Sequence, residues 1–424
     1  MLKRISAIAM ITLLSASLVA CSNSTGSTAS SSQTSAQTTS KASAEASNTS
    51  ADSSSIFTDR DLSQTADTSD AKNITLSDGK DVTITEEGVY TISGTANNVS
   101  IIVDAKDDAK VQLVLENANI TNTDSPCIYV KNADKVFVTT SNGSENTLTV
   151  SDSFTADGDT KTDAVIFSKD DIVLNGEGKL NISSTDNGIS GKDDIKITGG
   201  TINITCTADA VEANDSISVA DGNITINTQK DGFHCENEDD NTKGSIYFSG
   251  GTFDITAASD GIQATTTLVI DGGTFNISSA EGLEATNITI NDGNITISAS
   301  DDGINASSKS TAQSVCITIN GGNIKITMGQ GDTDGIDSNG DLYITGGTVD
   351  ITGQSTCDYD GKAEKTGGTL IINGEETDTI PNQMMGGHGG MGGNMGGGPG
   401  GNMGGGPGGD MGGGPGGDMG GFQM

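Results

Sequence analysis

The sequence has no tryptophan, few other aromatic residues and few basic residues. Aromatic residues make up 3% of the 424 residues, and 21 Lys and Arg stand against 57 Asp and Glu, which gives a formal net charge of -36. Nucleic acid is excluded as a partner because too few basic side chains are available to neutralise phosphates. The natural counterpart of such a chain is a divalent cation, or a surface reached through one.

The N-terminus has the pattern of an export signal. Lys3 and Arg4 precede an apolar segment, Ile5 to Val19, which is too short for a typical membrane span. The run Leu18-Val19-Ala20-Cys21 resembles the bacterial lipobox, in which the chain is cut before a cysteine that then carries lipid. We expect residues 1–20 to be a lipoprotein signal peptide and Cys21 to anchor the protein at the extracellular face of the cell membrane. The alternative is an ordinary secretory signal with a chance cysteine.

Two low-complexity segments flank the middle of the chain. Residues 21–71 are rich in Ser and Thr without an apolar period, so we expect a flexible linker. Residues 376–424 are rich in Gly and Met, and we expect a disordered tail. Its methionines recur every eight residues at Met395, Met403, Met411 and Met419. With His388 they are candidate ligands for a soft cation such as Cu(I), and the alternative is a weakly adhesive tail.

Between these segments the sequence repeats with a period near 21 residues. Each copy contains three short runs in which apolar and polar residues alternate, which is typical of half-buried strands. A fixed period of this length with longer loops in two copies indicates a solenoid. The copies align on Gly188, Ala210, Gly232, Gly261, Gly282, Gly303 and Gly335.

The repeat predicts an all-β fold, a right-handed single-stranded parallel β-helix of about ten coils of three short strands, over residues 72–375. A sandwich or a β-propeller is disfavoured, because propeller blades need about 40 residues each and aromatic motifs. Equivalent residues of adjacent coils then stack as ladders. One apolar ladder comprises Ile204, Ile226, Ile255, Ile277, Ile297, Ile326 and Ile351, and another comprises Ala213, Cys235, Ala264, Ala285 and Ala306.

The cysteines after Cys21 show no metal-site or disulfide spacing. They are Cys127, Cys206, Cys235, Cys316 and Cys357, an odd number with no C-x-x-C pair. Cys235 takes the place of an alanine in its ladder. We therefore expect buried free thiols with a packing role.

An acidic residue precedes the first-strand glycine in most copies. Neighbours in such a ladder lie about 4.8 Å apart and repel by roughly 1 kcal/mol even in bulk water. Ca²⁺ takes six to eight oxygen ligands and converts this repulsion into coordination. The alternative is that Asp-Gly only makes a turn. We refer to these predicted calcium ligands as the acid ladder: Asp209, Asp231, Asp260, Glu281, Asp302 and Asp334.

Three residues further on, the middle of the first strand is also polar and is predicted to face outward. The predicted ligand-binding residues in this line are Glu212, Gln263, Glu284, Asn305 and Asp337, with His234 at the equivalent position. A third outward line on the last strand is hydrophilic and flat, as an extended polymer would require. Tyr247 and Tyr343 on the second strand are candidates for stacking on a ligand.

Several segments carry a resemblance to a known family. They are DVTITEEGVYTISG, DDAKVQLVLENANITNTDSPCIYVKNADKV, AVIFSKDDIVLNGEGKLNI, NGISGKDDIKITGGTINI and the repeated DGI…GGT-x-x-I. Over residues 72–373 the chain resembles the clostridial carbohydrate-binding β-helix family, which has a fold similar to pectate lyases. The resemblance implies a calcium-bearing, non-catalytic protein that binds acidic sugar polymers and cellulose. Because tryptophan is absent and the surface is negative, we expect the ligand to be an acidic polysaccharide such as polygalacturonate, bound through bridging calcium. We expect the protein to be a monomer.

Three alternatives remain open. A calcium-dependent polysaccharide lyase needs a basic side chain as proton acceptor. Arg4 and Arg60 are the only arginines and lie before the repeat, so this role falls to a lysine such as Lys230, beside Asp231. Hydrolysis by paired carboxylates is the second alternative. The third is a structural surface adhesin that uses calcium only for rigidity.

Overall fold

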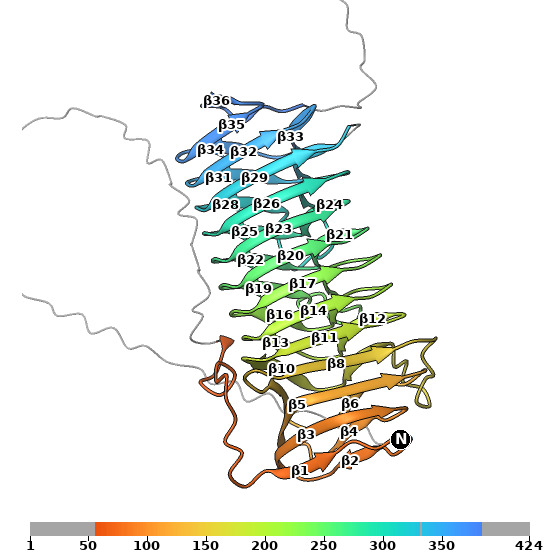
Figure 1. Ribbon diagram of the computed structural model, residues 1–424. Coiled ribbons are helices and arrows are strands. Elements are labelled where there is room, and N and C mark those ends of the chain that lie inside the picture. The colour runs from red at the N-terminus through yellow and green to blue at the C-terminus, as the bar shows by residue number, and fades with distance from the viewer. Residues whose placement is uncertain (1–55, 331–332, 384–424) are drawn as a thin grey trace, which may run out of the picture. The chain divides into compact units, whose positions relative to one another are not determined.

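The computed structural model describes residues 56–330 and 333–383, in which short strands stack coil upon coil into a parallel β-helix (Figure 1). Every pairing between named strands is parallel, except for one antiparallel pair at the C-terminal end of the stack. The prediction of an all-β parallel β-helix is therefore confirmed. None of the helices in the described ranges is long and apolar enough to cross a membrane.

The first strand of each coil belongs to a 12-stranded sheet, so the helix has more coils than the ten predicted. This count includes opening coils whose repeat is too irregular to align by sequence. The strands are β2 (Val82–Ile84), β4 (Ile101–Asp104), β6 (Ile128–Asn132), β9 (Ala164–Ser168), β12 (Asn187–Gly191), β15 (Val211–Ala213), β18 (Phe233–Cys235), β21 (Asp260–Ala264), β24 (Glu281–Ala285), β27 (Ile304–Ala306), β30 (Asp334–Ser338) and β33 (Ser355–Tyr359).

The second and third strands of the coils form two further parallel series. The second strands are β7 (Lys135–Thr140), β10 (Asp171–Gly176), β13 (Ile195–Ile197), β16 (Ser216–Val219), β19 (Ser245–Phe248), β22 (Thr267–Ile270), β25 (Asn287–Ile290), β28 (Cys316–Ile319), β31 (Asp341–Ile344) and β34 (Ala363–Lys365). The third strands are β8 (Glu145–Val150), β11 (Lys179–Ser183), β14 (Thr201–Thr205), β17 (Asn223–Asn227), β20 (Thr252–Thr256), β23 (Thr274–Ser279), β26 (Asn294–Ala299), β29 (Asn323–Met328), β32 (Thr348–Thr352) and β35 (Thr369–Ile372).

The two ends of the stack are built differently from its middle. At the start, β1 (Lys72–Thr75), β3 (Gly88–Asn97) and β5 (Lys110–Asn122) pair in parallel, and β3 and β5 each run through two strand positions, with an irregularity between Ile92 and Gly94. At the other end β36 (Glu375–Thr377) folds back antiparallel on β35. This pairing covers an edge that would otherwise be open to another strand.

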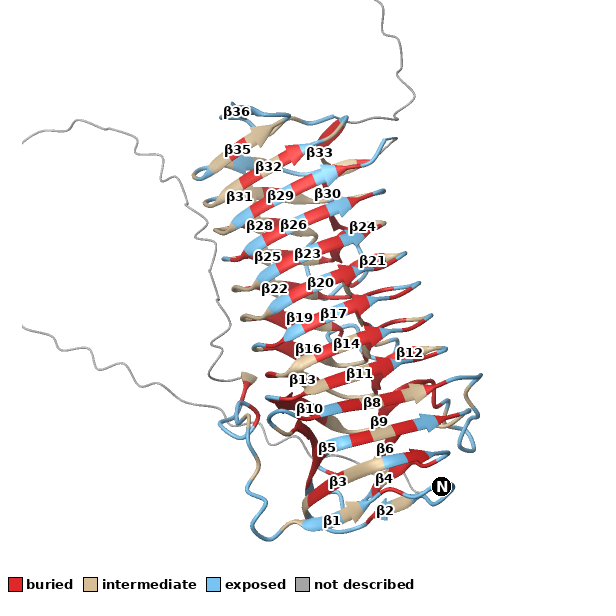
Figure 2. Cartoon of the chain, in the orientation of Figure 1, coloured by how far each residue is buried: buried red, intermediate tan, exposed pale blue. Residues whose placement is uncertain are grey.

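The core is the interior of the coils, where one residue in two points inward (Figure 2). The predicted isoleucine ladder is confirmed, since Ile204, Ile226, Ile255 and their successors pair in register from coil to coil. Each of these side chains is at most 2% exposed. Burying an isoleucine contributes about 1.5–3 kcal/mol, so the ladder is a major source of stability.

The cysteines behave as predicted at most positions. Cys127, Cys206, Cys235 and Cys357 are buried free thiols, whereas Cys316 is half-buried. Cys235 stacks between Ala213 and Ala264 in the alanine ladder. Burial raises the pKa of Cys127 and Cys357 to about 12, which fits a packing role rather than a reactive one.

The first-strand glycines are required by close packing between coils. A Cβ atom on Gly261 would lie 2.5 Å from Cγ2 of Ile277 and 2.6 Å from the carbonyl oxygen of Gly282. No side chain fits there without moving the third strand of the same coil or the first strand of the next. This contact explains why the acid ladder is followed by glycine in most coils.

The predicted linker, residues 21–71, ends earlier than its composition indicates. Phe57 and Asp61 are buried, and a segment that includes both lies beside β10 and β13 (Figure 1). Asp61 lies 3.7 Å from Lys135 Nζ and 3.4 Å from Lys196 Nζ. The Arg60 guanidinium lies 4.4 Å above the Phe137 ring. We call residues 56–64 the docking segment; it is ordered because it covers an apolar outer face and pairs buried charges.

Candidate functional site

The acid ladder lies along one edge of the first-strand sheet, and its carboxylates have main-chain partners. Asp209 accepts a hydrogen bond from the N–H of Asp231 at 3.0 Å, and Asp231 accepts one from the N–H of Asp260 at 2.9 Å. Asp302 accepts one from the N–H of Asp334 at 3.0 Å. These carboxylates therefore tie each coil to the next, a structural role beyond the Asp-Gly turn considered from the sequence.

The ladder begins with an amide instead of an acid. Asn187 Oδ1 accepts the hydrogen bond from the N–H of Asp209 at 2.8 Å, so an uncharged side chain performs the same structural task. The main-chain contact alone does not require a charge. The main-chain contact therefore does not explain the negative charge at the later positions, and that charge favours cation binding there.

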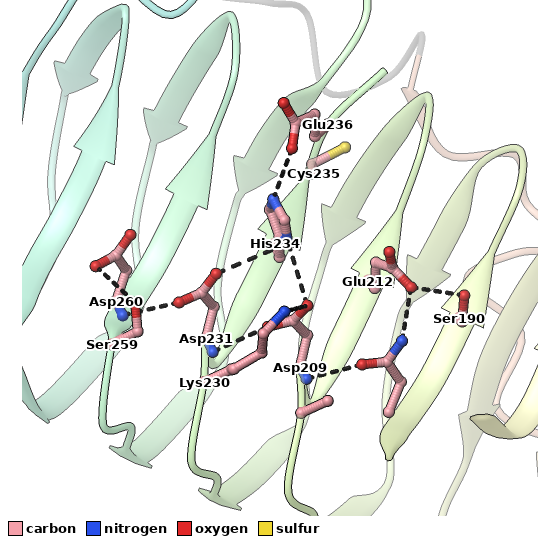
Figure 3. A network of polar contacts seen from close by, with 12 residues as sticks. Ser190, Asp209, Glu212, Lys230, Asp231, His234, Cys235, Glu236, Ser259 and Asp260 are labelled. Atoms are coloured by element: carbon pink, nitrogen blue, oxygen red, sulfur yellow. Dashed lines mark hydrogen bonds and ion pairs between the residues drawn. The ribbon is translucent and has the colours of Figure 1, made fainter. Parts of the chain in front are cut away.

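The first cluster of possible metal ligands comprises Asp209, Asp231 and His234, whose ligand atoms all lie within 4.8 Å of one another (Figure 3). His234 Nδ1 lies 3.3 Å from Asp209 Oδ2 and 3.7 Å from Asp231 Oδ2. Its Nε2 lies 3.4 Å from a carboxylate oxygen of Glu236. Lys230 Nζ, which comes from the turn before β18, lies 3.5 Å from Asp209 Oδ2.

The pKa values of the residues in this cluster depend on burial and on the single imidazole among them. Burial lowers the pKa of His234, but the hydrogen bond to Asp209 and the charges of Asp209 and Asp231 outweigh it and leave the pKa raised. Burial raises the pKa of Asp209, but His234, the N–H of Asp231 and Lys230 leave it lowered. The pKa of Asp231 is raised by burial and by the like charge of Asp209. The imidazole therefore favours the ionised form of Asp209, and the two carboxylates favour the protonated form of the imidazole.

The second cluster comprises Asp260, Glu281 and Glu284 and offers only oxygen atoms. Asp260 pairs with Glu281 across adjacent coils, and Asn305 Nδ2 donates to Glu281 at 3.0 Å. Asn305 is 8% exposed, and its Oδ1 is buried with no hydrogen-bond partner. An orphaned buried oxygen costs free energy unless a donor or a cation satisfies it.

Burial and like charges raise the pKa of several acids along this part of the ladder. Burial and the charge of Glu284 raise the pKa of Glu281 to about 7. Burial, together with Asp301 and Asp334, raises that of Asp302 to about 6. Burial, together with Asp302 and Asp334, raises that of Asp337 to about 7. Asp260 shifts in the same direction because of burial and the charges of Asp231 and Glu281. Such crowding is relieved by protonation or by a bound cation.

The two clusters differ in the metal that they fit. The set of Asp260, Glu281 and Glu284, with Asn305 beside it, consists of hard oxygen donors, as Ca²⁺ requires. The set of Asp209, Asp231 and His234 includes an imidazole nitrogen, which is typical of transition-metal sites. The calcium prediction therefore fits Asp260 and Glu281 better than Asp209 and Asp231.

The predicted ligand-binding line also stacks in register, but its side chains turn toward the acid ladder. Glu212 accepts hydrogen bonds from Asn187 at 2.9 Å and from Ser190 at 2.8 Å. Gln263, with its amide oriented to satisfy both groups, donates to Asp231 and accepts from Lys309. The whole line pairs as Glu212, His234, Gln263, Glu284, Asn305 and Asp337. Many of these groups are thus neighbours of the possible metal ligands.

One further cluster of acidic residues was not predicted from the sequence. Asp171 at the start of β10 and Asp193 and Asp194 in the turn before β13 place their ligand atoms within 4.8 Å of one another. The signal was present as Lys-Asp-Asp in consecutive coils, at 169–171 and 192–194. Because paired acids are common in this chain, the motif does not stand out in the sequence.

The outward line of the third strand is confirmed as a polar face, and one stacking candidate is not available. Asn203, Thr225, Asp254 and Asn276 pair from coil to coil on that face. Tyr247 is 7% exposed because the docking segment covers it, and its ring centroid lies 6.4 Å from that of Phe57. Tyr343 is half-buried and donates to Asp341 at 2.9 Å.

Comparison with known proteins establishes the family. The profile of the carbohydrate-binding domain-containing protein family matches residues 78–333 and 281–383. The chain belongs to this family of carbohydrate-binding proteins. A curated relative of that description from Acetivibrio thermocellus is 43% identical over 124 residues, which make up 28% of this chain and 43% of the relative. The match thus spans less than half the length of that relative.

A solved structure is similar over much of the chain. It is described as the polysaccharide lyase-like protein from C. thermocellum, in a gadolinium derivative. It is 27% identical, with a TM-score of 0.41, and the match covers 71% of this chain and 96% of the other.

Proposed function

We propose that this protein is a lipid-anchored cell-surface protein that binds acidic polysaccharide without cleaving it, through a β-helix that carries calcium. The observation that carries the proposal is the cluster of Asp260, Glu281 and Glu284 beside the unpartnered buried oxygen of Asn305. Buried carboxylates in contact with one another destabilise a metal-free protein. A bound cation offsets that cost, and it leaves coordination positions for an anionic ligand.

The charge of the protein supports an acidic ligand that is bridged by metal. With a formal net charge of -36, the surface repels a uronate chain unless cations lie between the two. No tryptophan is available as a platform for a flat neutral glucan. Calcium held by carboxylates on several adjacent coils would bind an extended polymer at several points, which strengthens attachment by avidity.

The anchor is part of the proposal. Residues 1–55, which include the proposed signal peptide and Cys21, lie outside the described residues. A lipidated Cys21 would be followed by a Ser/Thr-rich tether that joins the β-helix at the docking segment, near β10 and β13. Globomycin treatment of expressing cells tests this proposal, because accumulation of the uncut precursor is expected only for a lipoprotein.

The binding function is tested by calorimetry on the full chain. The protein is stripped with a chelator, titrated with Ca²⁺ and then titrated with oligogalacturonate, while the ultraviolet absorbance of an unsaturated product is followed. We expect calcium binding, then calcium-dependent sugar binding with a constant absorbance. Binding that survives excess EDTA would contradict the bridging role of calcium. Calcium binding without any sugar binding would favour a structural adhesin.

A lyase is the second candidate, and Lys230 is the observation that favours it. Its ammonium lies 3.5 Å from Asp209 beside the first cluster, and its side chain is 60% exposed and thus accessible to a polymer. A lysine can serve as a general base, and a bound metal would acidify the carbon next to a uronate carboxylate by polarising that carboxylate. Ion pairing with Asp209 competes with that role. Rising absorbance in the same titration, abolished by Lys230→Met, would establish the lyase.

A further inference from the structure

A large cleft lies on the outer face of the first-strand sheet. Its volume is about 980 Å³, at the upper end of the range of small-molecule sites. The floor includes outward residues of β9, β15 and β18, namely Phe167, Glu212 and His234. The walls are the loop before β9 and the insertion that follows β18. The cleft is therefore built by two of the segments that interrupt the regular coils.

Lysines gather in this cleft although they are scarce in the sequence. Lys161, Lys169, Lys192 and Lys243 all line it. Lys243 is paired closely with Asp215, but Lys192 Nζ lies 3.9 Å from Glu212, and Lys161 remains 81% exposed beside Asp163. Among the described residues, Lys169 has no carboxylate within the 4.0 Å of an ion pair. Three of these ammonium groups can therefore still form ion pairs with an anionic ligand.

Asp163 supplies an independent observation that points to a ligand. It lines the cleft and is 4% exposed, and Lys161 Nζ lies 3.3 Å from its Oδ2. Its other oxygen, Oδ1, is buried and accepts no hydrogen bond. A buried carboxylate oxygen without a donor is costly, and a sugar hydroxyl is a suitable donor for it.

We infer that this cleft is the subsite in which a short segment of the acidic polysaccharide binds. Lys161, Lys169 and Lys192 pair with its carboxylates, and Asp163 accepts from its hydroxyls. The inference rests on the proposed function and locates it in the molecule. The carboxylates that line the cleft outnumber the lysines, so an anionic sugar binds only after cations have filled the neighbouring clusters, which contribute His234 and Asp193 to the lining.

The test is calorimetric titration of the full chain with oligogalacturonate in saturating Ca²⁺. Lys169→Gln and Lys192→Gln are each expected to raise Kd about tenfold, which corresponds to about 1.4 kcal/mol. Lys80→Gln is the matched control, because Lys80 is an exposed lysine between β1 and β2, away from the cleft, and the variant should bind as the wild type does. A fully methyl-esterified oligogalacturonate, which has the same rings without the charge, should bind weakly to all four proteins.

The outcomes separate the two proposals. If the wild type binds the charged oligomer and the cleft variants bind it equally well, the cleft is not the subsite, and the proposed function stands. If the wild type itself binds no oligomer, the proposed function fails and the inference fails with it. Titration of each variant with Ca²⁺ alone should match the wild type. A variant that loses calcium binding would contradict the separation between the lysines and the metal clusters.

Discussion

The carboxylate of Asp231 accepts a hydrogen bond from the main-chain N–H of Asp260, one coil further along the helix, at 2.9 Å. The same carboxylate belongs to a cluster that offers metal ligands. One side chain therefore joins two coils and belongs to a group of carboxylates whose charge a cation or His234 can offset. These two roles are separable, since Asn187 performs the first of them without a charge.

The two roles of Asp231 are distinguished by a pair of substitutions. Asp231→Asn keeps an acceptor oxygen and removes the charge, so the chelator-treated variant should be at least as stable as the wild type but should lose metal at this cluster. Asp231→Ala leaves the buried N–H of Asp260 without its partner, which costs about 1–3 kcal/mol. Urea unfolding with and without Ca²⁺ measures both effects. Equal destabilisation by the two substitutions would refute the structural role of the oxygen.

The metal-free protein should become less stable as the pH rises from about 5 to 8. The folded-state pKa values of Glu281 and Asp337, about 7, and of Asp302, about 6, lie above the usual values of these groups. Between the unfolded and folded pKa values the native state binds more protons, so the free energy of unfolding falls as pH increases. Thermal unfolding in EDTA across this range measures the trend.

Added calcium should reverse that pH dependence. The cation binds the ionised carboxylates, so its stabilising effect grows as they lose their protons. The difference in Tm between calcium and EDTA should therefore widen from pH 5 to pH 8. A difference that does not change with pH would show that these carboxylates are not the ligands.

The sequence was sufficient to predict those parts of the fold that repeat. The isoleucine ladder, the alanine ladder with Cys235 and the stacking of Asp260 on Glu281 follow from a period near 21 residues, because a parallel coil places equivalent residues one above another. Features that depend on a single contact between distant segments could not be predicted. The ion pair between Asp61 and Lys196 joins residues that lie 135 positions apart in the sequence, and no local sequence pattern predicts it.

The candidate site, like the fold, was predictable from the sequence only where the sequence repeats. The period located the carboxylates, but not which of them converge within ligand distance or that Asn305 keeps an unpartnered oxygen. The cleft could not be predicted from the sequence either, because its walls are insertions that break the repeat and so carry no periodic signal. Side-chain direction and loop conformation decide these features, and neither follows from spacing alone.

The first-strand glycines should be intolerant of even one added carbon atom. Gly261→Ala places a Cβ 2.5 Å from Ile277 and 2.6 Å from the carbonyl oxygen of Gly282, and overpacking of this kind costs about 1–3 kcal/mol. Gly329→Ala is the control, since the nearest heavy atom there is 3.4 Å away. Denaturant unfolding of both variants checks the prediction, which fails if Gly261→Ala is as stable as the control.

The docking segment should detach when its buried charge is removed. Asp61 is fully buried between Lys135 and Lys196, whose side chains are 13% exposed. Burial raises the pKa of Asp61, but the N–H of Thr58 and the two lysines outweigh it and leave the pKa lowered, so the carboxylate is ionised and pairs with both. Asp61→Asn leaves two ammonium groups without their counter-charge, and breaking such a buried pair costs about 3–5 kcal/mol.

Detachment is local, so it is measured by limited proteolysis between residues 56 and 71 rather than by global unfolding. Asp61→Asn should be cut there rapidly, while the β-helix that begins at β1 stays intact. Asp59→Asn, an exposed acid in the same segment, should be cut at the wild-type rate. If both variants resist cleavage, the ring of Phe57 against Tyr247 and the guanidinium of Arg60 over Phe137 hold the segment without the charge of Asp61. Combined Phe57→Ala and Arg60→Ala substitutions would then be required to free the docking segment from the side of the β-helix.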